Sequence, residues 1–397
     1  MRQGKIFTEK TLQMKRLPLF LCFSLSCCWL PAQSTLIGSF EHDGLLREYL
    51  LYVPAMYDGS EPVPLVLNFH GYTSNALEQM FYGDFRPIAD TAGFLLVHPQ
   101  GTLFNGNAHW NVGGWTVGST VDDVGFTKAL IDTLAVHYNI DLERVYATGM
   151  SNGGYMSFLL ACQLSDRIAA IASVTGSMTP ETWNDCAPLR PVPVLQIHGD
   201  SDGVVPYGGA PWTKPIEEVI QFWVDFDHCL PTPTVFSLPD VVSTDGSYVE
   251  RFLYDGGDAG STVEHFKVYG GGHTWPGSGI NLPGTNQDFD ASAEIWRFFS
   301  QYDLNGSIND PTTSTRDPSA PPATLTAFPN PTSGPLSVRY SAQAQTPCTV
   351  FDARGRKVRT RPFNGPSATL DLTGLPQGAY FLHVDGQVLK IIKTEGN

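Results

Sequence analysis

The chain has 397 residues, of which 42% are hydrophobic and 16% charged, and its formal net charge is −15. This composition excludes a disordered chain, and the length exceeds the roughly 100 to 200 residues of one typical domain, so we expect one large domain and a smaller one. Residues 33–324 hold 34 Asp and Glu against 11 Lys and Arg, and so acidic a body repels phosphate backbones, which excludes nucleic acid as a partner.

The first 32 residues have the pattern of a signal peptide. Two basic residues precede an apolar run over 17–30, and a small residue follows at the expected cleavage point. The run is short for a membrane span, so we expect no transmembrane segment in the mature chain. Translation from Met14 and a lipoprotein anchor at Cys27 are the alternatives for this segment.

Strand patterns dominate the next part of the chain. From Ser34 to Pro54, two alternating runs flank the turn residues 42–44, which predicts an antiparallel hairpin. Six short β-rich runs that end in small or polar residues are typical of buried strands in a largely parallel sheet. They cover residues 64–71, 94–101, 144–149, 168–176, 193–200 and 263–273.

Helical patterns lie between these strands. The capping pair Asp122–Asp123 precedes a pattern of 3.6-residue period up to Tyr138, and further helices are expected over 154–164 and 293–302. Strands that alternate with helices predict a doubly wound, mostly parallel α/β domain over 33–304. Ligands of such a domain bind beyond the carboxyl ends of its strands.

The remainder of the chain changes character twice. Residues 305–324 are rich in Asn, Asp, Pro, Ser and Thr without apolar periodicity, which predicts a linker. Residues 325–397 contain short β-rich runs separated by turn residues, as in a small all-β sandwich. We therefore expect a second, C-terminal domain.

Four cysteines follow the signal peptide, namely Cys162, Cys186, Cys229 and Cys348. In an exported protein such residues can pair. Cys348 lies in the C-terminal segment and Cys162 within an apolar helical pattern, so we favour a Cys186–Cys229 disulfide. The alternative is that all four are buried free thiols.

The pattern G-x-S-x-G occurs twice, and only one copy has the right surroundings. The copy at 149–153 lies between the strand at 144–149 and the helix at 154–164, where a sharp turn would lift the Ser151 hydroxyl clear of the sheet. Prolines and glycines after the copy at 199–203 prevent an immediate helix. We therefore predict Ser151 as a nucleophile.

A serine nucleophile needs a base that takes its proton and a carboxylate that fixes the tautomer of the base. In a fold of this kind the three residues follow in the order Ser, Asp or Glu, His. Asp202 follows the strand at 193–200, and His273 ends the segment 263–273 among glycines. We predict Asp202 as the acid and His273 as the base, and we expect the nearby Asp200 to cap the loop.

The negative charge of a tetrahedral intermediate needs backbone N–H donors. One predicted donor is the amide of Asn152, which directly follows the nucleophile. The other is the amide of Tyr72, because the sequence His70–Gly71–Tyr72 after the first buried strand is similar to an oxyanion loop. His70 itself is expected to be structural.

Tryptophans and a possible metal site complete the candidate residues. Trp115, Trp212 and Trp275 lie in loops near the predicted site, as does Trp110, and indole rings stack on sugar or phenolic rings. The first three are our predicted substrate-binding residues, and core packing is the alternative for each. A metal ion at this place would leave Ser151 without a role, so we expect no metal and no cofactor. Its ligands would be His198, Asp200, Asp202 and His273.

Four ordered motifs carry a resemblance to a known family over about residues 35–302. They are DDVGF (122–126), GMSNGGYM (149–156), IHGDSDGVVPYGG (197–209) and GGGHTWPG (270–277). They resemble the secreted esterases that group feruloyl and acetylxylan esterases with polyhydroxybutyrate depolymerases. The resemblance implies an α/β-hydrolase fold, no cofactor, and a triad at Ser151, Asp202 and His273. It also implies a disulfide similar to Cys186–Cys229.

The C-terminal segment resembles a second family over about residues 325–397. The motifs are FPNPTSGPLSV (328–338), VFDARGRKV (350–358), LPQGAYFLHV (375–384) and the closing KIIK (390–393). They resemble the C-terminal sorting domain of the type IX secretion system of Bacteroidetes. This implies export through the periplasm and outer membrane, with the secretion machinery as a partner. A small carbohydrate-binding module is the alternative for this segment.

The resemblance and the residues together predict a secreted serine esterase. We expect it to cleave feruloyl or acetyl esters of plant cell-wall xylan through an acyl-enzyme, with an ester-bearing polysaccharide as its partner. A depolymerase of short-chain polyhydroxyalkanoates is the alternative. A different class also stays open, a surface binding protein on an inactive hydrolase scaffold.

Overall fold

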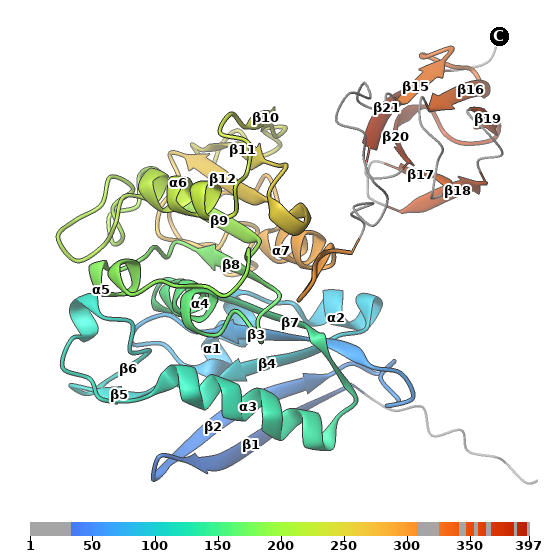
Figure 1. Ribbon diagram of the computed structural model, residues 1–397. Coiled ribbons are helices and arrows are strands. Elements are labelled where there is room, and N and C mark those ends of the chain that lie inside the picture. Colours follow the sequence, from blue (N-terminus) through green and yellow to red (C-terminus); the bar gives the residue numbers. More distant parts are fainter. Residues whose placement is uncertain are drawn as a thin grey trace, which may run out of the picture.

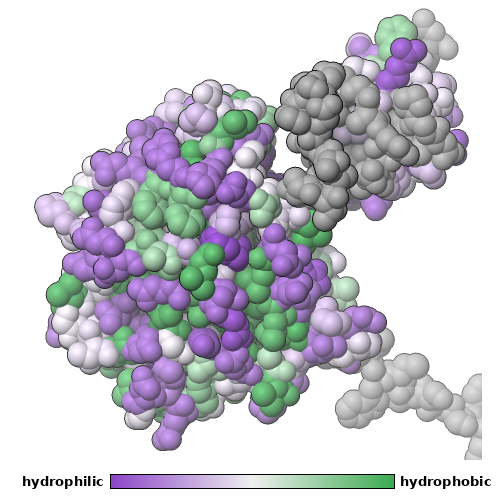
Figure 2. Space-filling view, in the orientation of Figure 1, coloured by the Kyte–Doolittle hydropathy of each residue, from purple (hydrophilic) through white to green (hydrophobic). Residues whose placement is uncertain are grey.

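The structure is a computed structural model that describes residues 33–308, 325–340, 347–352, 356–362, 367–384 and 387–394. The predicted signal peptide and residues 309–324 of the predicted linker lie outside the described residues. In the view of Figure 2, hydrophilic side chains cover much of the surface and hydrophobic ones form small separate groups.

A ten-stranded sheet forms the centre of the large unit (Figure 1). Its strands lie in the order β1 (Ser34–His42), β2 (Leu45–Val53), β4 (Leu95–Pro99), β3 (Val63–Phe69), β7 (Ile140–Met150), β8 (Ala170–Val174), β9 (Val194–Gly199), β12 (Val263–Tyr269), β11 (Tyr248–Tyr254) and β10 (Thr234–Ser237). From β4 to β12 all neighbours are parallel, whereas β2 runs antiparallel to β1 and β4, and β11 runs antiparallel to β12 and β10.

The first eight strands in this order have the topology of the α/β-hydrolase fold, which confirms the predicted fold class. The six predicted buried strands correspond to β3, β4, β7, β8, β9 and β12. The predicted hairpin is β1 and β2, and its turn at Asp43 and Gly44 has φ of 49° and 73°. Glycine adopts this left-handed backbone without steric cost, which explains its place in the turn.

Helices cover both faces of the sheet. They are α1 (Ala76–Tyr82), α2 (Arg86–Ala92), α3 (Asp123–His137), α4 (Asn152–Gln163), α5 (Pro180–Asn184), α6 (Ile216–Phe226) and α7 (Ala291–Phe299). Successive side chains of β3 point to opposite faces. Leu65 and Leu67 pack in the cluster with α3, α4 and α6, whereas Val66 packs with α2 and α7.

Several elements are absent from the predictions above. These are α1, α2, α5, α6, the edge strands β10 and β11, and the short hairpins β5 (Thr102–Phe104) with β6 (Asn107–His109) and β13 (Tyr302–Asp303) with β14 (Gly306–Ser307). The last hairpin includes the first residues of the predicted linker. The Ile308 amide donates to the Gln301 carbonyl at 2.8 Å, so the described chain is still hydrogen-bonded there.

Two small antiparallel sheets form the C-terminal unit, as predicted. One contains β15 (Leu325–Phe328), β16 (Pro335–Tyr340) and β19 (Ser367–Asp371), and the other contains β18 (Lys357–Arg361), β17 (Cys348–Asp352), β20 (Gly378–Val384) and β21 (Gln387–Lys393). Both sheets contribute to one buried apolar cluster, which includes Val338, Leu370, Val350 and Leu382. Alternating buried and exposed residues along β16 are typical of a sandwich with one face inward.

The predicted Cys186–Cys229 disulfide is wrong, because Cys186 pairs with Cys162. Their Cα atoms lie 4.6 Å apart, within the range that a disulfide spans. Cys162 stands near the end of α4, and the segment after α5 lies against that end because the Leu189 amide donates to Ser165 Oγ at 2.8 Å. Cys229 is a buried free thiol, and burial raises its pKa to about 12.

Candidate active site

Ser151 occupies the turn between the central strand and its helix. Strand β7 ends at Met150 and α4 begins at Asn152, so Ser151 is the single residue between them. Its backbone has φ 53° and ψ −118°, a combination that non-glycine residues rarely adopt and that is typical of a nucleophile elbow. A Cβ at Gly153 would collide with the Phe69 carbonyl, which explains why glycine is needed there.

The second G-x-S-x-G copy has a different setting. Ser201 is exposed in a turn after β9, and the next α-helix begins only at Ile216. The strand-to-helix turn predicted from the sequence is therefore present at Ser151 and absent at Ser201.

Asp202 and His273 form a hydrogen-bonded pair. Asp202 follows β9 and His273 follows β12, and these parallel neighbours bring the two loops together. His273 Nδ1 lies 2.7 Å from Asp202 Oδ2. The amides of Val204 and Val205 donate to Oδ1 at 2.8 and 2.9 Å, and the Asp202 side chain is completely buried.

The surroundings of Asp202 favour its ionised form. Burial alone would raise the pKa of Asp202, but the hydrogen bond and charge of His273, the nearby His198 and the Val205 amide together lower it below its usual range. Asp200, in contrast, is exposed and its Oδ1 accepts from the Gly270 amide at 2.8 Å. Asp200 thus holds the loop after β12.

A pocket of about 240 Å³ lies at the predicted nucleophile. It is lined by Tyr72, Trp115, Ser151, Val204, Val205 and Trp212. Val205 also binds Asp202 through its amide, so the pocket wall and the acid belong to one loop. The strands that precede Ser151 and Asp202 are separated only by β8. Because their carboxyl ends meet at one edge, the structure brings Ser151 and the Asp202–His273 pair to the same side of the sheet.

The loop after β3 brings backbone amides toward Ser151. A Cβ built on Gly71 would lie 3.5 Å from the Cβ of Ser151, so the two backbones are in close approach. His70 holds this loop: its Nδ1 donates to the Gly71 carbonyl at 2.7 Å, and its Nε2 accepts from the Gly101 amide at 2.9 Å. Burial lowers the pKa of His70 to about 4, so the ring is neutral and serves a structural role.

Asn152 uses its side chain to hold a neighbouring loop. Its Oδ1 accepts from the Trp110 amide at 2.7 Å, and its Nδ2 donates to the Trp110 carbonyl at 3.1 Å. Its own amide is the first of α4, and the first amides of a helix have no acceptor within that helix. The Asn152 amide is thus positioned beside Ser151 with the positive end of the helix dipole behind it.

Two of the three predicted substrate-binding tryptophans line the pocket. Trp115, within the short 3₁₀ helix Gly114–Thr116, meets Trp212 edge to face with ring centroids 5.2 Å apart. It also packs edge to face on Tyr155 at 4.9 Å. The pocket therefore has an aromatic wall.

The prediction that Trp275 binds substrate is wrong. Trp275 is only 1% exposed, its Nε1 donates to Ser292 Oγ at 3.1 Å, and its ring packs against Phe85. Its amide also donates to the Tyr82 hydroxyl at 3.1 Å. Trp110 is buried as well, and its Nε1 donates to the His70 carbonyl at 2.9 Å. Both indoles therefore support the loops that carry other site residues.

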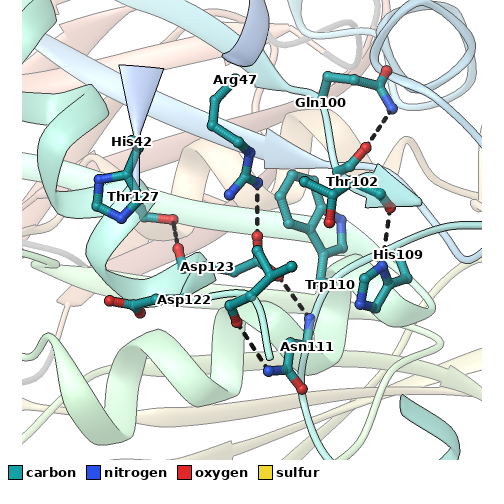
Figure 3. Close-up of polar contacts among 12 residues, drawn as sticks. His42, Arg47, Gln100, Thr102, His109, Trp110, Asn111, Asp122, Asp123 and Thr127 are labelled. Carbon is teal, nitrogen blue, oxygen red and sulfur yellow. Dashed lines mark hydrogen bonds and ion pairs between the residues drawn. The ribbon is translucent and has the colours of Figure 1, made fainter. Parts of the chain in front are cut away.

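A buried ion pair that the sequence analysis did not predict holds the loop before Trp115 (Figure 3). Arg47 of β2 donates from Nη2 to Asp123 Oδ1 at 2.7 Å, and neither side chain is more than 1% exposed. Asp123 Oδ2 accepts from the Asn111 amide at 2.8 Å. The two aspartates of the DDVGF motif therefore have different structural roles. Asp122 caps α3 by accepting from the Gly125 amide, and Asp123 holds the loop that contains Asn111.

The four side chains of the alternative metal site do not form a ligand set. Both ring nitrogens of His198 are already hydrogen-bonded, to Gln196 and to the Val205 carbonyl. Within the part of the chain that the structure describes, the group spaced for metal binding is His42, Asp43 and Asp122, which includes none of the four.

The sequence of this chain matches a known family of esterases. Residues 47–206 match the family described as esterase PHB depolymerase. The putative esterase NocK of Nocardia uniformis is 30% identical over 261 residues, which are 59% of this chain and 72% of that protein. The chain belongs to the esterase PHB depolymerase family.

Other similar proteins differ in length from this chain. The bifunctional acetylxylan esterase/xylanase XynS20E of Neocallimastix patriciarum is 28% identical over 67% of this chain, which spans only 35% of that protein. Feruloyl esterase B of Piromyces equi is 29% identical, and the chain spans 42% of its length. An acetyl xylan esterase structure from Aspergillus awamori is 14% identical with a TM-score of 0.48, covering 67% of this chain and 99% of that one.

The C-terminal unit matches a different family from the large unit. Residues 326–394 match the secretion system C-terminal sorting domain. This match indicates export by type IX secretion to the cell surface or the medium. Among the described helices, none has the length and apolarity that a membrane crossing requires.

Proposed function

We propose that this esterase PHB depolymerase family member is an exported serine esterase. The observation that carries the proposal is the 2.7 Å hydrogen bond between Asp202 and His273, on the same sheet edge as the strained turn at Ser151. Since the Nδ1 of His273 is bonded to Asp202, its Nε2 is the atom that takes the Ser151 proton. A serine esterase mechanism of this kind requires no metal ion or cofactor.

The reaction follows from these positions. Ser151 Oγ attacks the ester carbonyl carbon as its proton passes to His273, and the resulting oxyanion accepts hydrogen bonds from the amides of Tyr72 and Asn152. His273 then gives the proton to the leaving alkoxide, the C–O bond breaks, and an acyl-enzyme remains. A water molecule, deprotonated by His273, releases the acid and restores Ser151.

For the substrate we propose feruloyl or acetyl esters of plant cell-wall xylan. Trp115, Trp212 and Tyr72 give the pocket an aromatic wall against which a phenolic acyl group can stack. A pocket of about 240 Å³ is smaller than most ligand sites and suits a single small acyl group. Relatives named for feruloyl and acetylxylan ester cleavage support this choice.

One observation favours polyester depolymerisation as a second candidate. An apolar groove of about 500 Å³ runs between α1 and the loop after His273, lined chiefly by Leu77, Phe81, Ile280 and Leu282. Its two polar residues, Ser74 and Glu78, are hydrogen-bonded to each other at 2.7 Å. Such a groove suits an apolar polyester chain. Poly(3-hydroxyalkanoate) depolymerase C of Paucimonas lemoignei is 26% identical, with 68% of each chain covered.

The Trp115→Ala variant tests the choice of acyl group. We expect its kcat/KM for methyl ferulate to fall about tenfold, because an aromatic pair contributes about 0.5–1.5 kcal/mol beyond its buried area. The value for acetylated xylan should change less than about twofold, and Trp115→Phe should recover most of the loss. The measurement is steady-state hydrolysis of methyl ferulate, acetylated xylan and a hydroxybutyrate oligomer side by side. A wild-type protein that cleaves only the oligomer would favour the depolymerase instead.

A further inference from the structure

His198 stands directly behind the Asp202–His273 pair and has no role in the mechanism above. It lies in β9, four residues before Asp202, and its side chain is completely buried. Its Nε2 is 2.9 Å from the Val205 carbonyl and 3.4 Å from Asp202 Oδ2. Asp202 Oδ2 thus lies near two histidines, the predicted base His273 and the buried His198.

The hydrogen bonds around His198 permit one tautomer. The Val205 carbonyl can only accept, so Nε2 carries the proton. Gln196 Nε2 lies 2.8 Å from the Gly176 carbonyl and 3.0 Å from His198 Nδ1. Because the Gly176 carbonyl fixes the orientation of the Gln196 amide, its nitrogen donates to Nδ1. Burial lowers the pKa of His198 to about 4, so the ring stays neutral at physiological pH.

This arrangement acts on Asp202 in two ways. The Val205 amide donates to Asp202 Oδ1 while its carbonyl accepts from His198, so His198 restrains the residue that holds the acid. The protonated Nε2 of His198 also lies 3.4 Å from Oδ2, the oxygen that accepts from His273. A polarised N–H group at this distance stabilises the carboxylate and makes it a weaker acceptor for His273.

We propose that His198, oriented by Gln196, is a positioning residue that fixes the Asp202 loop and weakens the basicity of the carboxylate toward His273. The inference rests on the proposed serine-esterase function and adds to it. It predicts that loss of the His198 donor moves the acid limb of the pH profile to higher pH.

Other titratable groups near His198 do not compete in the same pH range. His265 of β12 is buried, which lowers its pKa to about 3. Tyr207, whose ring centroid is 6.0 Å from that of His198, and Tyr155 of α4, which faces Asp202, both have pKa values raised by burial. These three groups therefore do not titrate between about pH 4 and 9.

The test is the pH dependence of kcat/KM for p-nitrophenyl acetate. In His198→Asn the side-chain amide takes the place of Nδ1, and the donor at the Nε2 position is lost. The acid limb of the profile should therefore move to higher pH by about 0.5 pH unit, which is about a threefold change in proton affinity. His198→Gln returns an N–H to the Nε2 position and should restore the wild-type limb. Gln196→Met removes the donor that holds Nδ1 and so loosens the ring; it should move the limb in the same direction and serves if His198→Asn does not fold.

The possible outcomes separate two failures. If the variants lose activity equally at all pH values and the limb stays in place, His198 is merely structural and the inference is overturned. If wild-type hydrolysis survives in Ser151→Ala, the serine-esterase function itself is wrong. A limb that moves in His198→Asn and returns in His198→Gln supports the inference.

Discussion

Replacing Ser151 by alanine is expected to lower kcat for ester hydrolysis by about 10⁶-fold, the typical cost of removing the nucleophile of a serine triad. The hydroxyl is the atom that forms the acyl-enzyme, and no neighbouring side chain of the pocket can replace it. KM should change little, because the pocket walls stay intact. The measurement is steady-state hydrolysis of p-nitrophenyl acetate and methyl ferulate by the exported, folded protein.

Ser201 provides a matched control for this experiment. It occupies the other G-x-S-x-G copy but is exposed in a turn, where its hydroxyl donates only to Asp200 at 3.2 Å. Ser201→Ala should therefore keep kcat within about twofold, as exposed substitutions usually do. Undiminished hydrolysis by Ser151→Ala would defeat the nucleophile assignment and leave a binding protein on a hydrolase scaffold as the better account.

Substitution of Asp202 by asparagine is expected to lower kcat by about 10⁴-fold. The carboxylate accepts from His273 Nδ1 at 2.7 Å and so leaves the other ring nitrogen free to act as the base. An amide at this position can donate its N–H to Nδ1, which would fix the opposite tautomer and prevent proton transfer from Ser151. Binding should be preserved, so KM serves as an internal check on folding.

The comparison with Asp200→Asn decides between the two aspartates. Asp200 is exposed and accepts from the Gly270 amide, and no bond to His273 is present among its described contacts. We expect Asp200→Asn to retain kcat within about twofold. A larger loss in Asp200→Asn than in Asp202→Asn would mean that the acid has been misassigned.

Local sequence patterns predicted the sheet and the elbow because both depend on short segments. The six buried strands contain short runs rich in apolar residues, and all residues of β4 and β8 are in fact buried. The turn at Ser151 was predictable because the strand, the two glycines and the helix are adjacent in the chain. The order Ser, Asp, His then pointed to loops after the right strands.

Contacts between distant segments explain what the sequence did not reveal. The partner of Cys186 depends on how the chain after α5 meets the end of α4, and the burial of Trp275 depends on its packing against Phe85 and Ser292. The Arg47–Asp123 pair joins residues 76 positions apart. None of these pairings produces periodicity or a motif, so only the folded chain displays them.

The central claim is that Ser151, Asp202 and His273 act as one unit. The most direct test measures kcat for p-nitrophenyl acetate in Ser151→Ala, His273→Ala and the double variant. When two residues act as one unit, the losses in kcat from removing each of them do not multiply. The double variant should therefore be no slower than Ser151→Ala alone. If the two losses instead multiply, the hydroxyl and the imidazole work independently and the triad is contradicted.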